Sequence, residues 1–152
     1  MHVTVGKHAG KSVELLILKF PDYVHWLLKT SVSGPLLIVK THIKTLIAKF
    51  DAKPLLRDCR GHNCNLKATR ATVYGINLTP EWWCANCDPY QLGANPGKLQ
   101  AVKTYGNALD HVEFYCSSRK SDFQEIIKYL AQAKGLPSRA GEVQCKAFFA
   151  VI

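Results

Sequence analysis

The sequence predicts an α+β fold: a small N-terminal β-turn with helices, a central zinc-ribbon-like β-hairpin, and C-terminal helices. Apolar residues recur three and four positions apart over residues 21–29 and 35–50, which indicates amphipathic helices. A stretch rich in Thr, Val and Tyr, residues 67–83, lies between two pairs of cysteines and is typical of a hairpin. Helices and strands therefore occupy separate blocks of the chain, as in α+β proteins.

The N-terminal segment, residues 1–55, predicts a turn followed by helices. Residues 3–12 begin as a short strand and continue into a glycine-punctuated turn. Ser12 is a suitable N-cap, and Pro21 and Pro35 each suit the first position of a helix. The expected helices cover residues 12–18, 21–29 and 35–50.

The middle segment, residues 56–97, predicts the zinc-ribbon-like hairpin. Residues 67–74 and 81–83 have the composition of strands, and residues 75–79 between them are turn-like. The C-terminal segment, residues 98–152, is expected to mix helices with a strand and to pack with the rest as one compact unit. Its expected elements are a weak helix over 98–109, a strand over 112–116, a helix that starts at a Ser121–Gln124 capping box and stops at Gly135, and a helix over 142–149.

Four cysteines form two tight pairs, and they give the strongest chemical signal in the chain. Cys59 and Cys64 precede the hairpin, and Cys84 and Cys87 follow it. A tetrahedral metal site takes two ligands from each of two tight turns, and short gaps between cysteines supply them. We therefore predict that these four residues bind a structural Zn²⁺ in a closed site, which stabilises a small ribbon and leaves no position for catalytic water.

Other residues could compete for this role. His62 has the same two-residue gap from Cys59 that is common in zinc sites, so it is an alternative to Cys64 as the fourth ligand, although Cys64 is preferred because closed sites often use four thiolates. Cys116 and Cys145 are isolated in the sequence, and we expect each to be a small buried hydrophobic residue.

The net charge of +9 suggests a polyanionic partner, or simply a soluble surface. The excess is +6 in residues 1–57, zero in residues 58–97 and +3 in residues 98–152. No apolar stretch is long enough to cross a membrane, and the first residues lack the pattern of a secretory signal. With six cysteines, these features predict a cytoplasmic protein that uses thiols for metal binding and has no membrane partner.

Basic and aromatic residues interleave in two places. Lysines flank glycines in the N-terminal turn, where backbone amides could also hold a phosphate; the alternative is an exposed turn with solvated lysines. In the hairpin, adjacent tryptophans point to opposite faces, so one could stack on a base, unless both belong to the core. Two more lysines lie four apart on the polar side of the third helix. The candidate nucleic-acid-binding residues are Lys7, Lys11, Lys40, Lys44, Arg60, Arg70, Trp82 and Trp83.

The motif VGKHAGKS at residues 5–12, followed by PDYVHWLL at residues 21–28, resembles the exodeoxyribonuclease X-like C-terminal domain, a family also described as a quorum-sensing-regulated virulence factor. The resemblance extends from Val3 to about Phe50. It implies an auxiliary module that contacts nucleic acid, with Lys7 and Lys11 as an exposed basic pair and with Tyr23 and Trp26 packed together. In the exonuclease the module follows a catalytic domain with four acids, which this sequence lacks, so nuclease activity does not carry over.

Three functions are compatible with these patterns. The preferred interpretation is a non-catalytic, zinc-stabilised nucleic-acid-binding protein of a bacterium, phage or plasmid, with DNA favoured over RNA. The alternative is an adaptor that binds a nucleic-acid-processing enzyme through apolar surface near Trp82, Trp83 and Phe148–Phe149. The third is a small metal-dependent nuclease, which would require Asp110, His111 and Glu113 to converge. The scattered acids make an enzyme the least favoured interpretation.

Overall fold

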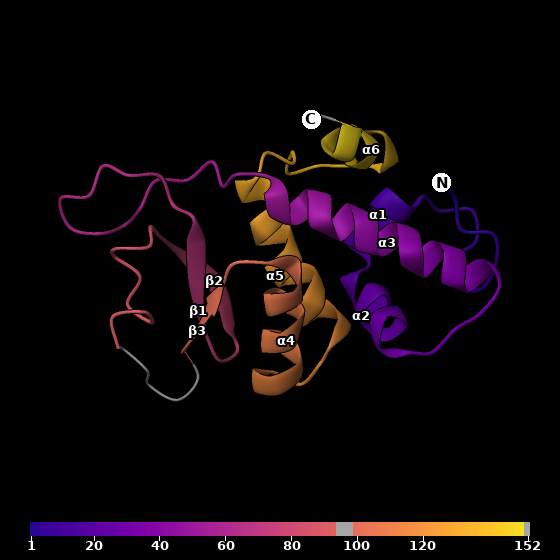
Figure 1. The fold of residues 1–152 in the computed structure, drawn as a ribbon, viewed down its shortest axis with the longest axis horizontal. Helices are drawn as coiled ribbons and strands as arrows, with labels where there is room; N and C mark the ends of the chain where they lie inside the picture. The colour runs from indigo at the N-terminus through magenta and orange to yellow at the C-terminus, as the bar shows by residue number, and fades with distance from the viewer. Residues whose placement is uncertain (94–98, 151–152) are drawn as a thin grey trace.

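The computed structural model describes residues 1–93 and 99–150, and it confirms the predicted α+β class. Within these residues the chain forms six helices and a three-stranded antiparallel sheet. Figure 1 shows the sheet at one end of the long axis, α1, α2 and α3 at the other, and α4 and α5 between them. The helices are α1 (Val13–Lys19), α2 (Pro21–Lys29), α3 (Pro35–Ala52), α4 (Tyr105–Tyr115), α5 (Lys120–Ala133) and α6 (Glu142–Ala150).

The three N-terminal helices and the last helix form where the sequence predicts them. Ser12 caps α1, because its hydroxyl oxygen accepts a hydrogen bond from the Leu15 amide at 3.2 Å. Pro21 and Pro35 occupy the first positions of α2 and α3. Proline fits there because the amide it lacks would have no partner within the helix.

The sheet has the strand order β2-β1-β3, and its hairpin lies where the sequence predicts one, although β2 begins at Asn77, inside the segment predicted to be a turn. β1 (Arg70–Tyr74) pairs with β2 (Asn77–Trp83) on one side and with β3 (Leu99–Val102) on the other. Ala71 lies opposite Trp82 and also opposite Val102. This register turns Ala71, Val73 and Val102 toward the helices, where all three are buried.

The prediction of a helix over 98–109 and a strand over 112–116 was wrong, because the order is a strand followed by a helix. Thr104 forms the capping box that the sequence analysis overlooked: its hydroxyl accepts the Asn107 amide at 3.0 Å, and the Asn107 side chain accepts the Thr104 amide at 3.2 Å. β3 exists because it pairs with β1, a contact between segments far apart in the sequence. Of the residues that suggested a strand in 112–116, Val112 belongs to the buried face of α4, whereas Phe114 is exposed.

The capping box predicted at Ser121 does not form. The N-cap of α5 lies two residues earlier, at Arg119, and makes no side-chain capping bond. Gln124 instead donates a hydrogen bond to the carbonyl of Lys19, the last residue of α1, at 3.1 Å. The side chain of Gln124, which the sequence pattern placed in a capping box, therefore joins α5 to α1.

One hydrophobic core includes residues from all three segments predicted from the sequence, 1–55, 56–97 and 98–152. The boundaries between these segments remain a prediction. The buried Tyr105 hydroxyl donates to the Ile17 carbonyl at 2.8 Å, and its ring meets Phe50 edge-on at 5.3 Å between centroids. Lys134 at the end of α5 is buried as well, and its ammonium donates to the carbonyls of Phe50 and Lys53 at 2.7 and 2.9 Å. These bonds satisfy the C-terminal carbonyls of α3, while burial lowers the pKa of Lys134.

None of the helices in residues 1–93 and 99–150 has both the length and the apolar character needed to cross a membrane.

Candidate metal centre

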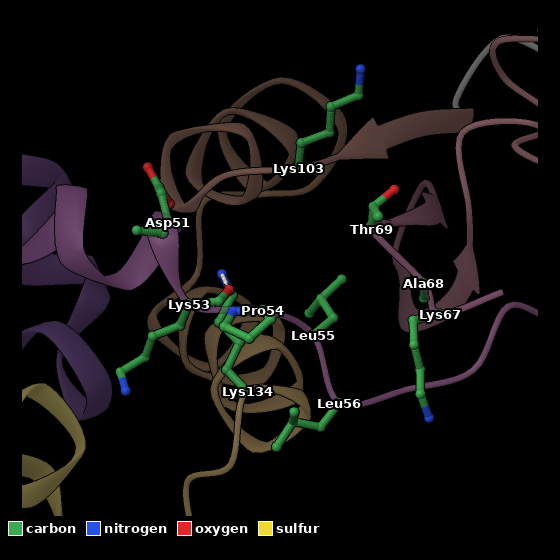
Figure 2. Close-up of a pocket in the computed structure, with 11 residues that line it drawn as sticks. Asp51, Lys53, Pro54, Leu55, Leu56, Lys67, Ala68, Thr69, Lys103 and Lys134 are labelled. Atoms are coloured by element: carbon green, nitrogen blue, oxygen red, sulfur yellow. Dashed lines mark hydrogen bonds between the residues drawn. The ribbon is translucent and has the colours of Figure 1, made fainter. Parts of the chain in front are cut away.

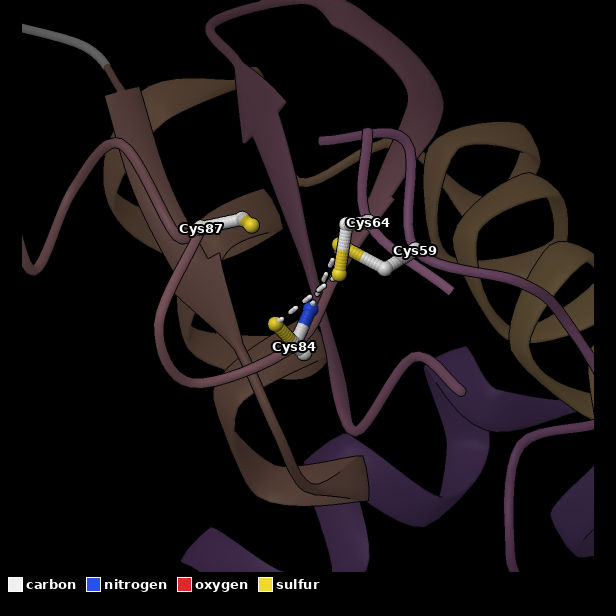
Figure 3. A group of neighbouring side chains, drawn as sticks. All are labelled: Cys59, Cys64, Cys84 and Cys87. Atoms are coloured by element: carbon white, nitrogen blue, oxygen red, sulfur yellow. Dashed lines mark hydrogen bonds between the residues drawn. The ribbon is translucent and has the colours of Figure 1, made fainter. Parts of the chain in front are cut away.

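Two tight turns beside the hairpin carry the four cysteines. We call residues 57–93, which contain β1, β2 and both turns, the cysteine ribbon. In the first turn the Cys64 amide donates to the Gly61 carbonyl at 3.1 Å, and Asn63 has a positive φ of 55°. In the second turn the amide of Cys87 donates to the Cys84 carbonyl at 3.3 Å. Each turn thus directs two thiols toward the space between the turns (Figure 3).

The four sulfur atoms have the spacing of a metal site. They all lie within 4.8 Å of one another, and the Sγ atoms of Cys64 and Cys84 are 3.8 Å apart. Four thiolates around a tetrahedral ion at a metal–sulfur distance of about 2.3 Å would be about 3.8 Å apart. Cys59 and Cys84 are buried, and Cys64 and Cys87 are partly exposed. The cluster therefore fits a divalent ion bound by four thiolates.

Gly61 makes room for the cluster, a role that the sequence analysis missed. A Cβ atom on Gly61 would lie 2.9 Å from Cys87 Cβ, closer still to Cys87 Sγ, and 3.3 Å from Cys64 Cβ. These atoms belong to two proposed ligands, so they cannot move without changing the site. The signal available in the sequence was a glycine two residues after the first cysteine, where the backbone must approach the second pair.

Backbone amides set the charge of the cluster when no metal is bound. Burial acts to raise the pKa of Cys59, but hydrogen bonds from the amides of Cys84 and Gly61, at 3.2 and 3.3 Å, outweigh it and lower the pKa to about 7. Cys87 behaves in the opposite way, because its interactions with the Cys84 and Cys59 thiols raise its pKa to about 12. Cys59 therefore ionises more readily than Cys87, and a thiolate is the form that binds metal.

The structure brings Cys64, not His62, into the cluster. His62 is exposed, and the four cysteines are the only group of three or more potential ligands found in the described part of the chain. Cys116 lies apart from them, and its thiol donates to the Gly75 carbonyl at 3.3 Å. Cys145 is fully buried between helices, and burial raises its pKa. Neither residue is placed to act as a ligand of the same ion.

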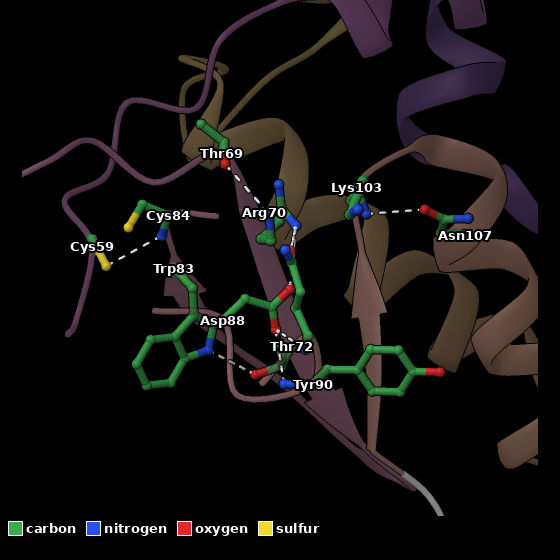
Figure 4. Close-up of polar contacts among 11 residues, drawn as sticks. Cys59, Thr69, Arg70, Thr72, Trp83, Cys84, Asp88, Tyr90, Lys103 and Asn107 are labelled. Carbon is green, nitrogen blue, oxygen red and sulfur yellow. Dashed lines mark hydrogen bonds and ion pairs between the residues drawn. The ribbon is translucent and has the colours of Figure 1, made fainter. Parts of the chain in front are cut away.

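Arg70 and Trp83 support the second turn from the outer face of the sheet (Figure 4). Asp88, which is almost fully buried, accepts the Tyr90 amide at 2.9 Å and pairs with the Arg70 guanidinium at 3.4 Å. The Trp83 indole N–H donates to the Thr72 hydroxyl at 2.9 Å. The contacts of Asp88 fix the chain directly after Cys87, and the Trp83 contact joins β2 to β1, so Arg70 and Trp83 are engaged within the protein.

The remaining predicted nucleic-acid-binding residues lie in different surroundings. Trp82 packs against the hydrophobic core, whereas Lys7, Lys44 and Arg60 are exposed. Lys11 and Lys40 each have a partner: the Lys11 ammonium is 2.9 Å from His8 Nδ1, and Lys40 donates to the Thr30 carbonyl at 2.9 Å. The N-terminal turn and the cysteine ribbon lie at opposite ends of the molecule (Figure 1), so the eight residues do not form one surface.

Asp110, His111 and Glu113 do not form a group of metal ligands, although Asp110 and His111 line the same cavity. His111 is buried, and its Nε2 lies 2.7 Å from the Gly75 carbonyl. Glu113 binds the ammonium of Lys29 at 2.9 Å and lies 3.5 Å from His25 Nε2.

Comparisons with protein-family models, with curated proteins and with solved structures found no match to this chain. The resemblance of residues 3–50 to the exonuclease-associated module therefore stays a prediction.

Proposed function

We propose that this protein is a zinc-stabilised, non-catalytic nucleic-acid-binding protein. Zinc is the natural ion for the cluster, because it favours four-coordinate sites with thiolate ligands and has no redox chemistry of its own. Cys59, Cys64, Cys84 and Cys87 would hold it. When bound, the ion supplies a cross-link between the two turns of the cysteine ribbon. All four ligands come from the protein, which supports a structural role for the ion.

The observation that carries the binding proposal is a group of three ammonium groups around the N-terminal turn. The Lys11 ammonium lies 4.4 Å from the centroid of the Phe20 ring, and that of Lys120, from α5, lies 5.4 Å from the same centroid. Lys7 adjoins the buried His8, whose pKa is lowered by burial and then by Lys11, Lys7 and Lys120. Among the described residues no carboxylate forms an ion pair with any of the three lysines.

Backbone amides add to this positive surface. The N–H groups of Lys7 and His8 donate no hydrogen bond within residues 1–93 and 99–150, and Lys7 is exposed. Gly6, with φ at 82°, and Gly10, with φ at 89°, give the turn a shape that other residues rarely adopt. Free amides beside ammonium groups are suited to phosphate oxygens, which they position without reading sequence. Asp22 is the acid that acts on His8 from this side, and it leaves the local charge positive.

A salt-dependent binding assay tests this proposal. Fluorescence anisotropy with labelled single-stranded and duplex DNA would be measured from low to high salt, with and without magnesium. We expect affinity to fall steeply with salt and no cleavage in magnesium. The double variant Lys7→Ala/Lys120→Ala should bind about tenfold more weakly and with a smaller salt dependence. Lys11 is left intact because its ammonium also contacts Nδ1 of the buried His8, at 2.9 Å.

The matched control is Lys49→Ala/Lys128→Ala, which removes the same charge from two exposed helical lysines elsewhere. If both double variants lose the same affinity, binding depends on net charge and the turn has no special role. A wild-type affinity that does not change with salt would contradict the phosphate mechanism altogether.

A protein-binding function is the second candidate, on a different surface from the one predicted. Phe148 and Phe149 are buried and both ribbon tryptophans are at least partly buried, so the predicted apolar patch is absent. Leu37 and Ile38 on α3 are instead 48% and 60% exposed, and they line a cavity of about 430 Å³ together with Met1. Failure of the wild type to bind any nucleic acid in the assay above would favour this alternative.

A further inference from the structure

A cleft of about 500 Å³ lies where the cysteine ribbon joins the helices, and it is separate from both the cysteine cluster and the N-terminal turn. Its walls come from the end of α3, the chain that leads into the ribbon, the three residues before β1, the link between β3 and α4, and the end of α5. Figure 2 shows these segments surrounding the cleft. Ligand sites often occur at such junctions between structural units.

The inner surface of the cleft is apolar and is held in place by backbone bonds. Pro54, Leu55, Leu56 and Ala68 line it. The Leu56 amide donates to the Ala133 carbonyl at 2.6 Å, and the Ala68 amide donates to the Arg57 carbonyl at 2.9 Å. These bonds tie the connecting chain to α5 on one side and to the ribbon on the other. The apolar floor is therefore formed before any ligand arrives.

The rim of the cleft is positively charged. Lys53, Lys67 and Lys103 lie around it, and in Figure 2 their side chains extend outward from the floor. The Lys53 ammonium lies over the Phe148 ring, 4.5 Å from its centroid, so it reaches a ligand in the cleft by a change of rotamer. The Lys103 side chain is exposed and has no ion-pair partner in the described part of the chain, whereas Lys67 pairs with Asp58 at 2.7 Å. Asp51 is the one acid among the residues that line the cleft, and its carboxylate accepts the Tyr105 amide at 2.8 Å.

We propose that this cleft holds one unpaired nucleotide of a single strand, an assignment that rests on the proposed nucleic-acid-binding function. The base lies against Leu55, Leu56 and Ala68, and the phosphates on either side meet the ammonium groups of Lys53 and Lys103. The volume is large enough for one nucleotide, and an apolar floor with a cationic rim matches a ligand that has a flat base and anionic ends.

This arrangement predicts a preference for single strands. A base in a duplex is stacked and paired, so it reaches a recessed floor only if it leaves the stack, which costs free energy. The phosphates of a duplex would still be attracted to the rim. The floor therefore contributes to single-strand affinity alone, whereas the rim contributes to both.

Two variants test the rim and the floor separately. Lys103→Glu reverses a charge at the rim, and its control Lys128→Glu does so on the exposed side of α5. Leu56→Gln makes the floor polar, and its control is Leu66→Gln; Leu56 is 59% exposed and Leu66 is 54% exposed, so both variants should fold. Anisotropy would be measured with labelled oligothymidylate and with a hairpin duplex of equal charge.

We expect Lys103→Glu to weaken oligothymidylate binding about tenfold more than Lys128→Glu does. Leu56→Gln should weaken oligothymidylate binding and leave duplex affinity unchanged, and Leu66→Gln should change neither. In methyl NMR spectra, oligothymidylate should shift the signals of Leu55, Leu56 and Ala68. The signals of Leu37 and Ile38, which line a different cavity, should stay in place.

Different failures have different meanings. If wild-type protein binds DNA but the cleft variants match their controls and the cleft methyls do not shift, the nucleotide assignment is wrong and the proposed function stands. If wild-type protein binds neither oligothymidylate nor the hairpin duplex, both proposals are wrong. If a peptide of alternating Glu and Leu shifts the cleft methyls at lower concentration than the oligonucleotide, the occupant is a protein segment, and the nucleotide assignment is again wrong.

Discussion

The cysteine ribbon and the six helices are held together in different ways. Large side chains such as Phe50, Tyr105 and Leu16 are fully buried among the helices. The ribbon contributes Val73 and Leu78 of its hairpin to the same core, but its two turns contribute none of their side chains. In the turns the buried side chains of Cys59 and Cys84 belong to the thiol cluster. Apolar burial therefore stabilises the helices and the inner face of the hairpin, whereas the turns would depend on the proposed metal ion.

This contrast teaches where a bound ion matters in the fold. A segment without a core of its own gains little free energy from burial, so the cost of ordering its backbone must be offset by a cross-link. The helices meet that cost through the hydrophobic core. The metal should accordingly be essential to one part of the molecule and nearly irrelevant to the rest.

Metal removal should produce the largest effect. We expect one zinc ion per chain by elemental analysis, and chelation should abolish the protection of backbone amides from hydrogen exchange in residues 57–69 and 84–93. The free energy of zinc binding to structural sites is on the order of 10 kcal/mol, which these turns would lose. The helical circular dichroism signal should remain, because the core of the helices does not include the cluster.

Two serine variants complete this test. Cys84→Ser should reproduce the effect of chelation, and Cys116→Ser, which keeps a donor for the Gly75 carbonyl, should retain full metal content. A purified protein without metal whose turns remain protected would show that the cysteine cluster is not a metal centre. If the helical circular dichroism signal is lost when the metal is removed, the helices depend on the metal as the turns do, and the contrast between the two regions is wrong.

Substitution of Gly61 should weaken zinc binding, with a smaller effect on the turns than complete removal of the metal. In Gly61→Ala the added methyl group overlaps atoms of Cys87, and forcing extra volume into a tight site costs about 1–3 kcal/mol. Zinc affinity, measured by competition with a chelating dye, should fall about tenfold to a hundredfold. Gly106→Ala is the matched control, because a Cβ there meets only Thr104 Oγ1, at 3.8 Å, and alanine suits a helix. Equal zinc affinities in both variants would contradict this account of Gly61.

The sequence was sufficient where the deciding contacts are local. Ser12 caps α1 by a bond to an amide three residues later, and the spacing of Cys84 and Cys87 is typical of a metal-binding turn. The sequence was insufficient where a contact with a distant segment determines the local structure. β3 requires β1 as a partner, and Gln124 follows a capping pattern yet donates to Lys19 across the core.

The candidate sites show the same limit. Arg70 looks like a free cation in the sequence, but Asp88, eighteen residues later, neutralises it. Lys120 carries no motif, and it joins the N-terminal lysines only because α5 packs on α1 and α2. A basic residue is recognisable from sequence, whereas the absence of an acid beside it is a property of the folded chain.

The smallest expected effect concerns His111, which joins the two regions by donating from Nε2 to the Gly75 carbonyl of the hairpin. Its Nδ1 is buried without a partner among the described residues, and burial lowers its pKa below 6.5. The folded state therefore binds this proton less readily than the unfolded state does. The contribution of His111 to stability is complete above pH 6.5 and is lost as the pH falls from 6.5 through the folded-state pKa, by about 1.4 kcal/mol for each unit between the two pKa values.

Two measurements check this prediction. An NMR titration should place the pKa of His111 below 6.5, and urea unfolding followed by helical circular dichroism should give a lower stability at pH 5.5 than at pH 7. His111→Gln keeps a donor for Gly75 and cannot titrate, so its stability should vary less with pH; the control His42→Gln should behave like wild type. The burial of His8 lowers its pKa too, so part of the pH dependence should survive in His111→Gln. A His111 pKa at or above 6.5 would mean that Nδ1 finds a partner in solution, and that the seam between ribbon and helices is open to water.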